Sequence, residues 1–418
     1  MSKRSLGGYI AVIDIGTTKI CVLIGVVNNQ GKVEIVGIGK HASNGLRKGV
    51  VVNINLTVES IKAALAQAQE GAGFMVESVV VGISGGHIKS YNSTGVVAVK
   101  GKDVTQYDID RVIEAAKAIP IPQDQEILHV LPQYFRIDGQ EYVLDSLGMY
   151  GVRLESQVHI ITGAVASAQN IIKSCELAGV KVEDIVLEQI ASADAVLTAS
   201  ERELGSGIID IGGGTSDFAV YKDGRIRHSK VLPIAGNHFT NDLAVGLGIS
   251  KAQAEEVKRM YGSVLKTSRR YLNGESVALP QEFESNPKVI PLSLIDEVLH
   301  FRAQEVFDFF TDEIQGYRLR SLMPSGIVLT GGGSLLQGVR ELAEERLDMP
   351  VRLGSPISTQ EMQITGLPDV LKSPIYSTAY GLMLYASGGR SKVEGDTANA
   401  TVFASVFRRM KSWIYDFL

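Results

Sequence analysis

The sequence predicts an α/β fold with two similar domains around a cleft, and three observations support this fold class. Two segments, "AVIDIGTTKICVLIG" and "GIIDIGGGTSDFAVY", share an apolar run, an Asp-Ile-Gly turn and a returning apolar run. Their aspartates, Asp14 and Asp210, are about 200 residues apart, which is too far for a solenoid repeat and fits two duplicated domains. A third apolar run, "SGIVLTGGGSLLQGV", also meets a glycine turn.

The composition is that of a folded globular protein, because 418 residues with 45% hydrophobic content supply enough apolar surface for several cores. The formal net charge of −5 gives no bulk attraction to nucleic acid, and we expect no nucleic-acid partner. Cys21 and Cys175 lack the spacing of a disulfide framework or a metal site, which fits a reducing cytoplasm. No apolar run approaches the roughly 20 residues that a membrane-spanning helix needs, so we expect no membrane crossing.

The N-terminal segment predicts the opening of an α/β domain. Apolar, β-rich runs at 9–15, 20–27 and 33–39 predict a three-stranded meander with "GTTK" at its first turn. A helical pattern begins near Thr57 and ends at a pair of glycines. The segment "ESVVVGIS" then predicts a strand that ends near Ser84.

Residues 85–162 interrupt this pattern and predict an inserted subdomain. A helix is expected from Thr105 to Ile119, where Pro120 stops it. Strands are expected near 127–136 and 149–154, and the next strongly β segment, "VHIITGAVA" at 158–166, follows this stretch.

The second half of the chain repeats the elements of the first. "DIVLEQIASADAVLTA" predicts a strand that enters a helix, and "GIIDIGGGTSDFAVYKDGRI" predicts a second hairpin with a glycine turn. Residues 387–401 are small and polar without periodicity, and they predict a flexible linker.

The two hairpin turns carry residues suited to a phosphate chain. In each, an aspartate ends the first strand, a glycine allows close backbone approach, and the next residues supply hydrogen-bond donors. One such turn alone is weak evidence, because glycine-rich hairpin turns are common. Two facing turns would hold a nucleotide tail, while both aspartates hold Mg²⁺ through water molecules. The candidate residues are Asp14, Gly16, Thr17, Thr18 and Lys19 in the first turn, and Asp210, Gly212, Gly213, Gly214 and Thr215 in the second.

These turns, the helix "EQIASADAVL", the loop "VLTGGGSLLQGV" and the closing "STAYGLMLYA" resemble the five nucleotide-site motifs of the actin, Hsp70 and sugar-kinase ATPase superfamily. The resemblance implies an actin-like ATPase fold that binds ATP or ADP with Mg²⁺. "AEEVKR" at 254–259 resembles the adenosine segment of the Hsp70 type, although the same letters alone also describe an ordinary solvated helix face. The residues implied are Glu255, Lys258 and Arg259 at the adenine and ribose, and Gly331, Gly332, Gly333 and Ser334 at the base and α-phosphate.

Nearly the whole chain resembles the FtsA family of bacterial cell-division proteins. Three features select this family: the insertion after Ser84, the lack of a peptide-binding domain after the ATPase core, and an amphipathic tail behind a linker. The resemblance implies four subdomains called 1A, 1C, 2A and 2B, of which 1C is the insertion. The expected ranges are 1–84, 163–195 and 359–386 for 1A, 85–162 for 1C, 196–226 and 304–358 for 2A, 227–303 for 2B, 387–402 for the linker and 403–418 for the tail helix.

The resemblance also implies a residue that orients water near the γ-phosphate, at the start of the helix "EQIASADAVL". Alignment of "LEQIASA" with the chaperone pattern "NEPTAAA" brings Gln189 close to the chaperone Glu, and Gln189 is the preferred candidate. The neighbouring Glu188 is the alternative, unless it is an exposed carboxylate before the helix. The chaperone proline is missing here, so we expect an ATP-binding switch with at most slow hydrolysis.

The C-terminal segment "FASVFRRMKSWIYDFL" predicts an amphipathic helix with an apolar stripe and basic residues opposite. A helix docked on its own domain would show the same stripe. The preceding linker, the single Trp of the chain and three clustered basic residues in an acidic protein favour a membrane surface instead. Membrane contact is expected from Phe403, Val406, Phe407, Arg408, Arg409, Met410, Lys411, Trp413, Ile414 and Phe417.

The resemblance implies a cell-division scaffold. It implies filaments on the cytoplasmic face of the inner membrane at the division site, binding of the C-terminal peptide of FtsZ by subdomain 2B, and recruitment of later division proteins by 1C. Two alternatives stay open: a small-molecule kinase of the same superfamily, which leaves the tail unexplained, and a PilM-like pilus-assembly ATPase.

Overall fold

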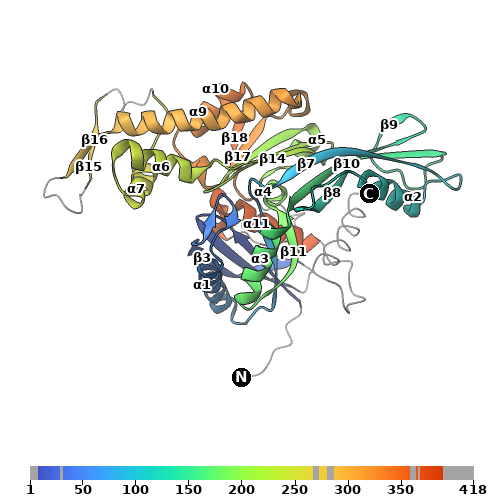
Figure 1. The fold of residues 1–418 in the computed structure, drawn as a ribbon, viewed down its shortest axis with the longest axis horizontal. Helices are drawn as coiled ribbons and strands as arrows, with labels where there is room; N and C mark the ends of the chain where they lie inside the picture. Colours follow the sequence, from blue (N-terminus) through green and yellow to red (C-terminus); the bar gives the residue numbers. More distant parts are fainter. Residues whose placement is uncertain are drawn as a thin grey trace.

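The computed structural model describes residues 8–28, 32–266, 273–279, 287–357, 364–365 and 368–388. The first domain lies at the bottom of Figure 1, the second domain lies above it and extends to the left, and the inserted subdomain extends to the right. Each of the three parts has its own cluster of buried apolar side chains.

The first domain is built on a sheet with the strand order β11-β6-β1-β2-β3-β19 within the described residues. As predicted, β1, β2 and β3 form an antiparallel meander, while β6 and β11 continue the sheet in parallel with β1. The strands are β1 (Tyr9–Ile15), β2 (Lys19–Val27), β3 (Val33–Ala42), β6 (Ser78–Ile83), β11 (Lys181–Leu187) and β19 (Ile364–Thr365), with a small separate hairpin of β4 (Leu46–Arg47) and β5 (Val50–Val51). The helices are α1 (Ile54–Ala72), α3 (Val165–Leu177), α4 (Glu188–Val196) and α11 (Ser377–Gly388), with short 3₁₀ turns η3 (Asp369–Lys372) and η4 (Pro374–Tyr376).

The second domain repeats this topology, with the strand order β14-β13-β12-β17-β18. An antiparallel meander again adjoins parallel strands, as in β3-β2-β1-β6-β11, so the predicted duplication is confirmed. The strands are β12 (Ser206–Ile211), β13 (Ser216–Lys222), β14 (Arg225–Leu232), β17 (Ile327–Thr330) and β18 (Val351–Leu353). Further elements of the core are α5 (Ala199–Leu204), η1 (Leu319–Leu322), η2 (Gly332–Leu335) and α10 (Val339–Leu347).

An outer part of the second domain lies at the left of Figure 1. Its long helix α9 joins this outer part to the core and crosses the expected boundary at 303 without a break. Its elements are α6 (Gly236–Leu247), α7 (Lys251–Tyr261), β15 (Ser276–Leu279), β16 (Lys288–Pro291) and α9 (Leu292–Gly316).

The inserted subdomain is an antiparallel sheet of order β7-β10-β8-β9 with one helix, α2, packed against it. The helix approaches the sheet very closely at Gly95, where a Cβ atom would lie 2.0 Å from the carbonyl oxygen of Val112. Its elements are β7 (Lys89–Ala98), α2 (Gln106–Ala116), β8 (Gln125–Ile137), β9 (Gln140–Val143) and β10 (Arg153–Ala164).

Two predicted strands of the insertion are corrected by the structure. Both ranges, 149–154 and 158–166, overlap a single strand, β10, which begins at Arg153 and ends at Ala164, while residues 149–152 precede the strand and 165–166 begin α3. The strand begins late because the carboxylate of Asp138 accepts the N–H groups of Val152 and Arg153. Strand β7 and helix α3 are additional elements that the sequence did not predict.

The observed ends of two helices differ from the predicted ends, and local hydrogen bonds explain the differences. The first helix begins at Ile54, before the predicted Thr57, because the side chain of Asn53 accepts the N–H of Leu56 as an N-cap. It ends at Gly73, which adopts the left-handed conformation with φ of 77°. Helix α2 begins at Gln106, one residue after the predicted start, because Thr105 is its N-cap, and it ends at Ala116, before the predicted Ile119.

The C-terminal predictions fall largely outside the described residues. Helix α11 continues to Gly388, so the first two residues of the range predicted as linker, 387–402, are helical. The remaining linker and the tail helix at 403–418 lie beyond the part of the chain that the structure describes. Among the described helices, none combines the length and the apolar content needed to span a membrane.

Candidate functional site

The two predicted phosphate turns have the same backbone geometry. In the first, the N–H of Gly16 donates to the carbonyl of Lys19 at 3.0 Å, and in the second the N–H of Gly212 donates to the carbonyl of Thr215 at 2.9 Å. A Cβ atom on Gly16 would lie 2.9 Å from the same carbonyl of Lys19, so this tight turn excludes a side chain.

The structure brings these two turns into direct contact across the domain boundary. A Cβ atom on Gly213 would lie 2.4 Å from Cγ2 of Thr18, and one on Gly214 would lie 2.2 Å from Oγ1 of Thr17. The hydroxyl of Thr17 is also held from its own domain, because it accepts the N–H of Gly49 at 2.9 Å. Glycine at these positions therefore allows two turns from different domains to face each other.

Asp14 and Asp210 lie at the ends of corresponding strands, β1 and β12, and both are buried. The ammonium of Lys19 forms an ion pair with Asp14 at 2.6 Å. The carboxylate of Asp210 accepts the hydroxyls of Ser192 and Thr378, which come from α4 and α11. Burial raises the pKa of Asp210, and the nearby charge of Asp14 adds to this shift.

A further carboxylate, Asp217 in β13, belongs to the same cluster. Burial and then the charges of Asp210 and Asp14 raise its pKa to about 7, although Ser84 donates to it at 2.6 Å. The sequence reasoning missed Asp217, yet the signal was present, because an aspartate directly follows the second glycine turn in "GGGTSD".

Glu188 and Gln189 occupy very different environments. Burial and the charges of Asp14, Asp217 and Asp210 raise the pKa of Glu188, so this side chain lies in the acidic cluster. Gln189 is fully buried, and neither polar atom of its amide has a hydrogen-bond partner among the described residues. The charges around Glu188 and the enclosure of Gln189 therefore make Glu188 our candidate for the residue near the turns, in place of Gln189, the preferred candidate from the sequence.

The third glycine loop lies against Asp210. Gly331 has φ of 82°, and a Cβ atom there would lie 2.2 Å from Oδ1 of Asp210. Gly333 is equally close to Ile211, whereas Gly332 has ordinary contacts. The hydroxyl of Ser334 donates to the carbonyl of Gly331 at 2.7 Å and therefore shapes the loop itself.

The predicted adenosine segment lies on α7, and two of its three residues form a network beside the second turn. The ammonium of Lys258 donates to Glu255 at 2.6 Å, to the hydroxyl of Thr240 at 2.8 Å and to the carbonyl of Gly236 at 3.1 Å. Gly236 in turn donates its N–H to the carbonyl of Gly212 at 3.0 Å. Arg259 is exposed on the same helix and is not part of this network.

The cluster has a chemistry that suits a cation. Four buried or half-buried carboxylates, those of Asp14, Asp210, Asp217 and Glu188, face one ammonium, that of Lys19. Within the described ranges, no three His, Cys, Asp or Glu side chains are grouped to hold a metal ion directly. A divalent ion that keeps its water shell fits this arrangement, because Mg²⁺ gives up its waters reluctantly.

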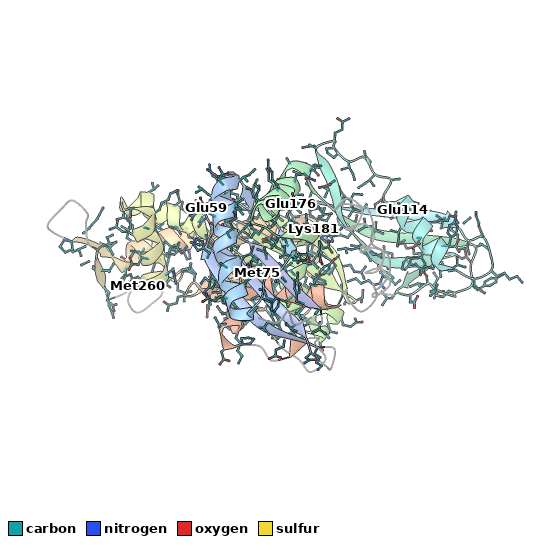
Figure 2. The ribbon with its side chains drawn as sticks, turned by 90° about the horizontal axis from the view of Figure 1, so that it is seen from below. Glu59, Met75, Glu114, Glu176, Lys181 and Met260 are labelled. Atoms are coloured by element: carbon teal, nitrogen blue, oxygen red, sulfur yellow. The ribbon has the colours of Figure 1, made fainter. Side chains whose placement is uncertain are left out.

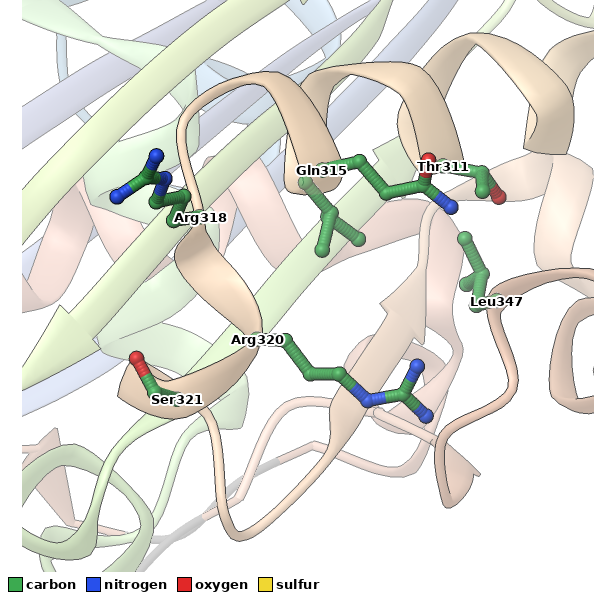
Figure 3. A pocket seen from close by; sticks show the side chains of 7 residues that line it. Thr311, Gln315, Arg318, Arg320, Ser321 and Leu347 are labelled. Atoms are coloured by element: carbon green, nitrogen blue, oxygen red, sulfur yellow. The ribbon is translucent and has the colours of Figure 1, made fainter.

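A separate pocket of about 440 Å³ lies where α9 ends, beside η1 and α10 (Figure 3). None of the predicted site residues lines it. Arg320 at its edge is paired with Asp348 at 2.7 Å. The lining residues are Thr311, Ile314, Gln315, Arg318, Arg320, Ser321 and Leu347.

Comparison with known proteins decides the family. The family model described as "Cell division protein FtsA" matches residues 207–381, and that of the "SHS2 domain inserted in FTSA" matches residues 85–162. Cell division protein FtsA of Pseudomonas aeruginosa is 44% identical over 420 residues, covering 99% of both chains. The chain belongs to the FtsA family of cell division proteins. The inserted sheet with α2 is accordingly the SHS2 domain of an FtsA-family chain.

Solved structures with low identity to this FtsA-family chain share its fold. The PilM-PilN type IV pilus biogenesis complex matches with a TM-score of 0.64 at 17% identity, covering 90% of this chain and 98% of that chain. MreB 5 of Spiroplasma citri bound to AMPPNP matches with a TM-score of 0.55 at 15% identity, covering 92% and 96%. These matches confirm the predicted actin-like α/β fold.

Proposed function

We propose that the cleft between the two hairpin turns binds ATP or ADP together with Mg²⁺. The observation that carries this proposal is the direct contact of two turns with identical backbone closure, each preceded by a buried aspartate. Backbone N–H groups of such turns bind the phosphate oxygens, and Asp14 and Asp210 hold the hydrated Mg²⁺ through its waters. Bound Mg²⁺ offsets the excess of carboxylates over ammonium groups.

The base end of the nucleotide lies on the side of α7 and the third glycine loop. Glu255 and Lys258 are held in place by Thr240 and contribute polar contacts to the ribose and adenine. Gly331 and Gly332 carry no side chain, which allows close approach of the base and the α-phosphate. Arg259 contributes from the exposed side of the same helix.

Hydrolysis at this site is slow, and the nucleotide acts as a switch. Glu188 orients the attacking water, because its carboxylate lies in the cluster with Asp14 and Asp210. Burial and the charges of Asp14, Asp217 and Asp210 raise the pKa of this carboxyl group.

At the level of the cell, this chain is a scaffold of the division site. Its nucleotide-bound form assembles into filaments on the cytoplasmic face of the inner membrane, held by the tail helix at 403–418. The outer part of the second domain, 227–303, binds the C-terminal peptide of FtsZ, and the inserted subdomain recruits later division proteins. The chain is 44% identical to a protein named cell division protein FtsA over 99% of both chains, and this supports the scaffold role over the kinase and PilM-like alternatives.

The nucleotide site is tested by isothermal titration calorimetry of the Asp210→Ala variant with Mg·ATP. We expect at least a tenfold weaker Kd, because Asp210 is buried directly before the second turn, where it would hold the Mg²⁺ waters. Asp369→Ala, which removes an exposed aspartate paired with Lys372, is the matched control and keeps the wild-type Kd. Equal Mg-dependent affinity in wild type and Asp210→Ala contradicts the proposal.

A further inference from the structure

The inserted subdomain makes a second connection between the two domains. It leaves the first domain directly after Ser84, at the end of β6, and returns through β10 into α3. Its sheet nevertheless lies beside β14, the edge strand of the second domain (Figure 1). Figure 2 shows Glu114 of this subdomain and Met260 of the outer part of the second domain at opposite ends of the molecule.

Polar side chains of the insertion donate hydrogen bonds to backbone carbonyl groups along the edge of β14. Gln133 donates to the carbonyls of Ile226 and Arg227 at 3.1 and 3.0 Å. Ser90 donates to the carbonyl of Ser229 at 2.7 Å. An edge strand exposes unpaired carbonyl groups, and here side chains from another domain pair with them instead of a further strand.

His159 lies at the centre of this contact and has a defined tautomer. Its Nδ1 lies 2.7 Å from Oδ1 of Asn92, and its Nε2 lies 2.9 Å from Oγ of Ser229. Because the amide oxygen only accepts, Nδ1 carries the proton and Nε2 accepts the hydroxyl of Ser229. Burial and the neighbouring His228 lower the pKa of His159 to about 3, so the ring is neutral.

The contact is buried, which makes it costly to leave half-formed. Gln133 is 2% exposed and His159 is 1% exposed. If β14 moved away without water replacing it, these side chains would lose their partners, and a buried unpaired polar group is strongly unfavourable. The contact is therefore expected to open and close as a unit.

The contact reaches the candidate nucleotide site by two short routes. Strand β14 pairs with β13, where Val231 is opposite Asp217. Ser84, the last residue before the insertion, donates to Asp217 at 2.6 Å from the other domain. If the insertion moves relative to the second domain, both β14 and Ser84 are displaced, and each of them contacts β13 at Asp217.

We propose that Ser90, Asn92, Gln133 and His159 with β14 form a polar latch that holds the two hairpin turns face to face. The latch couples the position of the inserted subdomain to occupancy of the cleft, and this coupling rests on the proposed nucleotide function. A partner that pulls on the insertion weakens nucleotide binding, and bound nucleotide restrains the insertion, because coupling between two sites is reciprocal.

The latch is tested by pulsed electron paramagnetic resonance distances on the full chain without nucleotide. Spin labels are placed at Glu114→Cys in α2 and Glu345→Cys in α10, both exposed, while Cys21 and Cys175 are buried. We expect one narrow distance distribution in the wild-type background and a broader one in Gln133→Leu. Gln106→Leu is the matched control, because Gln106 bonds Asp110 within α2, and it keeps the narrow distribution.

Calorimetry on the same variants tests the coupling. Loss of a few buried hydrogen bonds is expected to weaken Mg·ATP binding about three- to tenfold in Gln133→Leu and in the milder Ser229→Ala. His159→Gln, whose amide can reach the position of Nε2, is expected to keep most of the affinity.

The latch is overturned if the distance distributions of Gln133→Leu and Ser229→Ala are as narrow as that of the control. Broadened distributions with unchanged Kd overturn the coupling. A wild-type chain that binds no Mg·ATP overturns the proposed function and the coupling with it, whereas the distances without nucleotide still decide the latch.

Discussion

The first two residues of α4 lie in different surroundings, because consecutive side chains of a helix point in different directions. Glu188 and Gln189 both begin α4, yet Glu188 senses the charges of Asp14, Asp210 and Asp217, while Gln189 is enclosed in the core. We therefore expect substitution of Glu188 to change the chemistry of the site and substitution of Gln189 to change the stability of the fold.

We expect Glu188→Gln to lower the slow rate of ATP hydrolysis at least tenfold, because an amide is a poor base for the attacking water. Gln189→Leu is expected to keep the rate and to stabilise the fold by about 1 kcal/mol, since it removes a buried amide without partners. Phosphate release under saturating Mg·ATP and urea denaturation measure the two effects. If Gln189→Leu instead lowered the hydrolysis rate and Glu188→Gln did not, Gln189 would be the residue that orients the attacking water.

Asp217 predicts a pH dependence of stability in the nucleotide-free protein. Its pKa is about 7 in the folded state against an ordinary value of 3.8, so the folded state binds the proton more tightly. The resulting stabilisation is complete below pH 4 and is lost as the pH rises to 7. By linkage the loss is at most about 4 kcal/mol.

Urea denaturation of the wild type between pH 5 and pH 8 is expected to show this decrease in the free energy of unfolding. Asp217→Asn should make this decrease smaller, because the amide does not ionise, while Glu188 and Asp210, whose pKa values are also raised, keep their own contributions. Exposed Asp369→Asn serves as the control and keeps the wild-type slope. A slope in Asp217→Asn as steep as in the wild type would show that other groups cause it.

At the scale of elements, the third glycine loop offers a test at Gly331. Gly331 has positive φ and no room for a Cβ atom beside Asp210, whereas the nearest atom to a Cβ on Gly332 is 3.6 Å away. Gly331→Ala is expected to displace Asp210 or the loop and to weaken Mg·ATP binding more than tenfold.

Gly316→Ala, at the end of α9 and outside the proposed site, is the control, with expected affinity within about threefold of the wild type, since a Cβ atom there meets nothing within 4 Å. Calorimetry with Mg·ATP compares the two variants, and circular dichroism checks their folding. Equal affinities would mean that the close approach at Gly331 is not needed for binding.

At the scale of the whole molecule, we expect the actin-like core to bind nucleotide and the predicted tail to bind the membrane. Three basic residues near an anionic leaflet contribute about 1 kcal/mol each, in addition to the burial of apolar side chains. We therefore expect a single tail to bind reversibly and a filament carrying many tails to bind firmly, because each further tail would insert at high effective concentration.

Trp413→Glu is expected to abolish co-sedimentation with anionic vesicles, since it places a charge in the apolar stripe. Trp413→Phe, which keeps an aromatic anchor, should retain most of the binding. Nucleotide affinity should not change in either variant. Undiminished co-sedimentation of Trp413→Glu would refute the tail as the membrane anchor.

Much of the molecule could be predicted from local patterns. The two meanders and their turns follow from alternating apolar runs and Asp-Ile-Gly sequences, which act within a few residues. Strand β7 was missed because Ser90 and Asn92 are polar, and α3 was missed because Ala164 gives no side-chain cap. The polarity of β7 is explained only by β14, whose carbonyl groups accept from Ser90 and Asn92.

The sequence by itself determined the actin-like fold, the duplicated turns and the FtsA-family membership, because short motifs and their order along the chain carry this information. Tertiary structure alone decided that Glu188 rather than Gln189 lies near the aspartates, that Asp217 joins them, and that the insertion contacts β14. These features depend on groups that are far apart in the chain and meet only when both domains have folded.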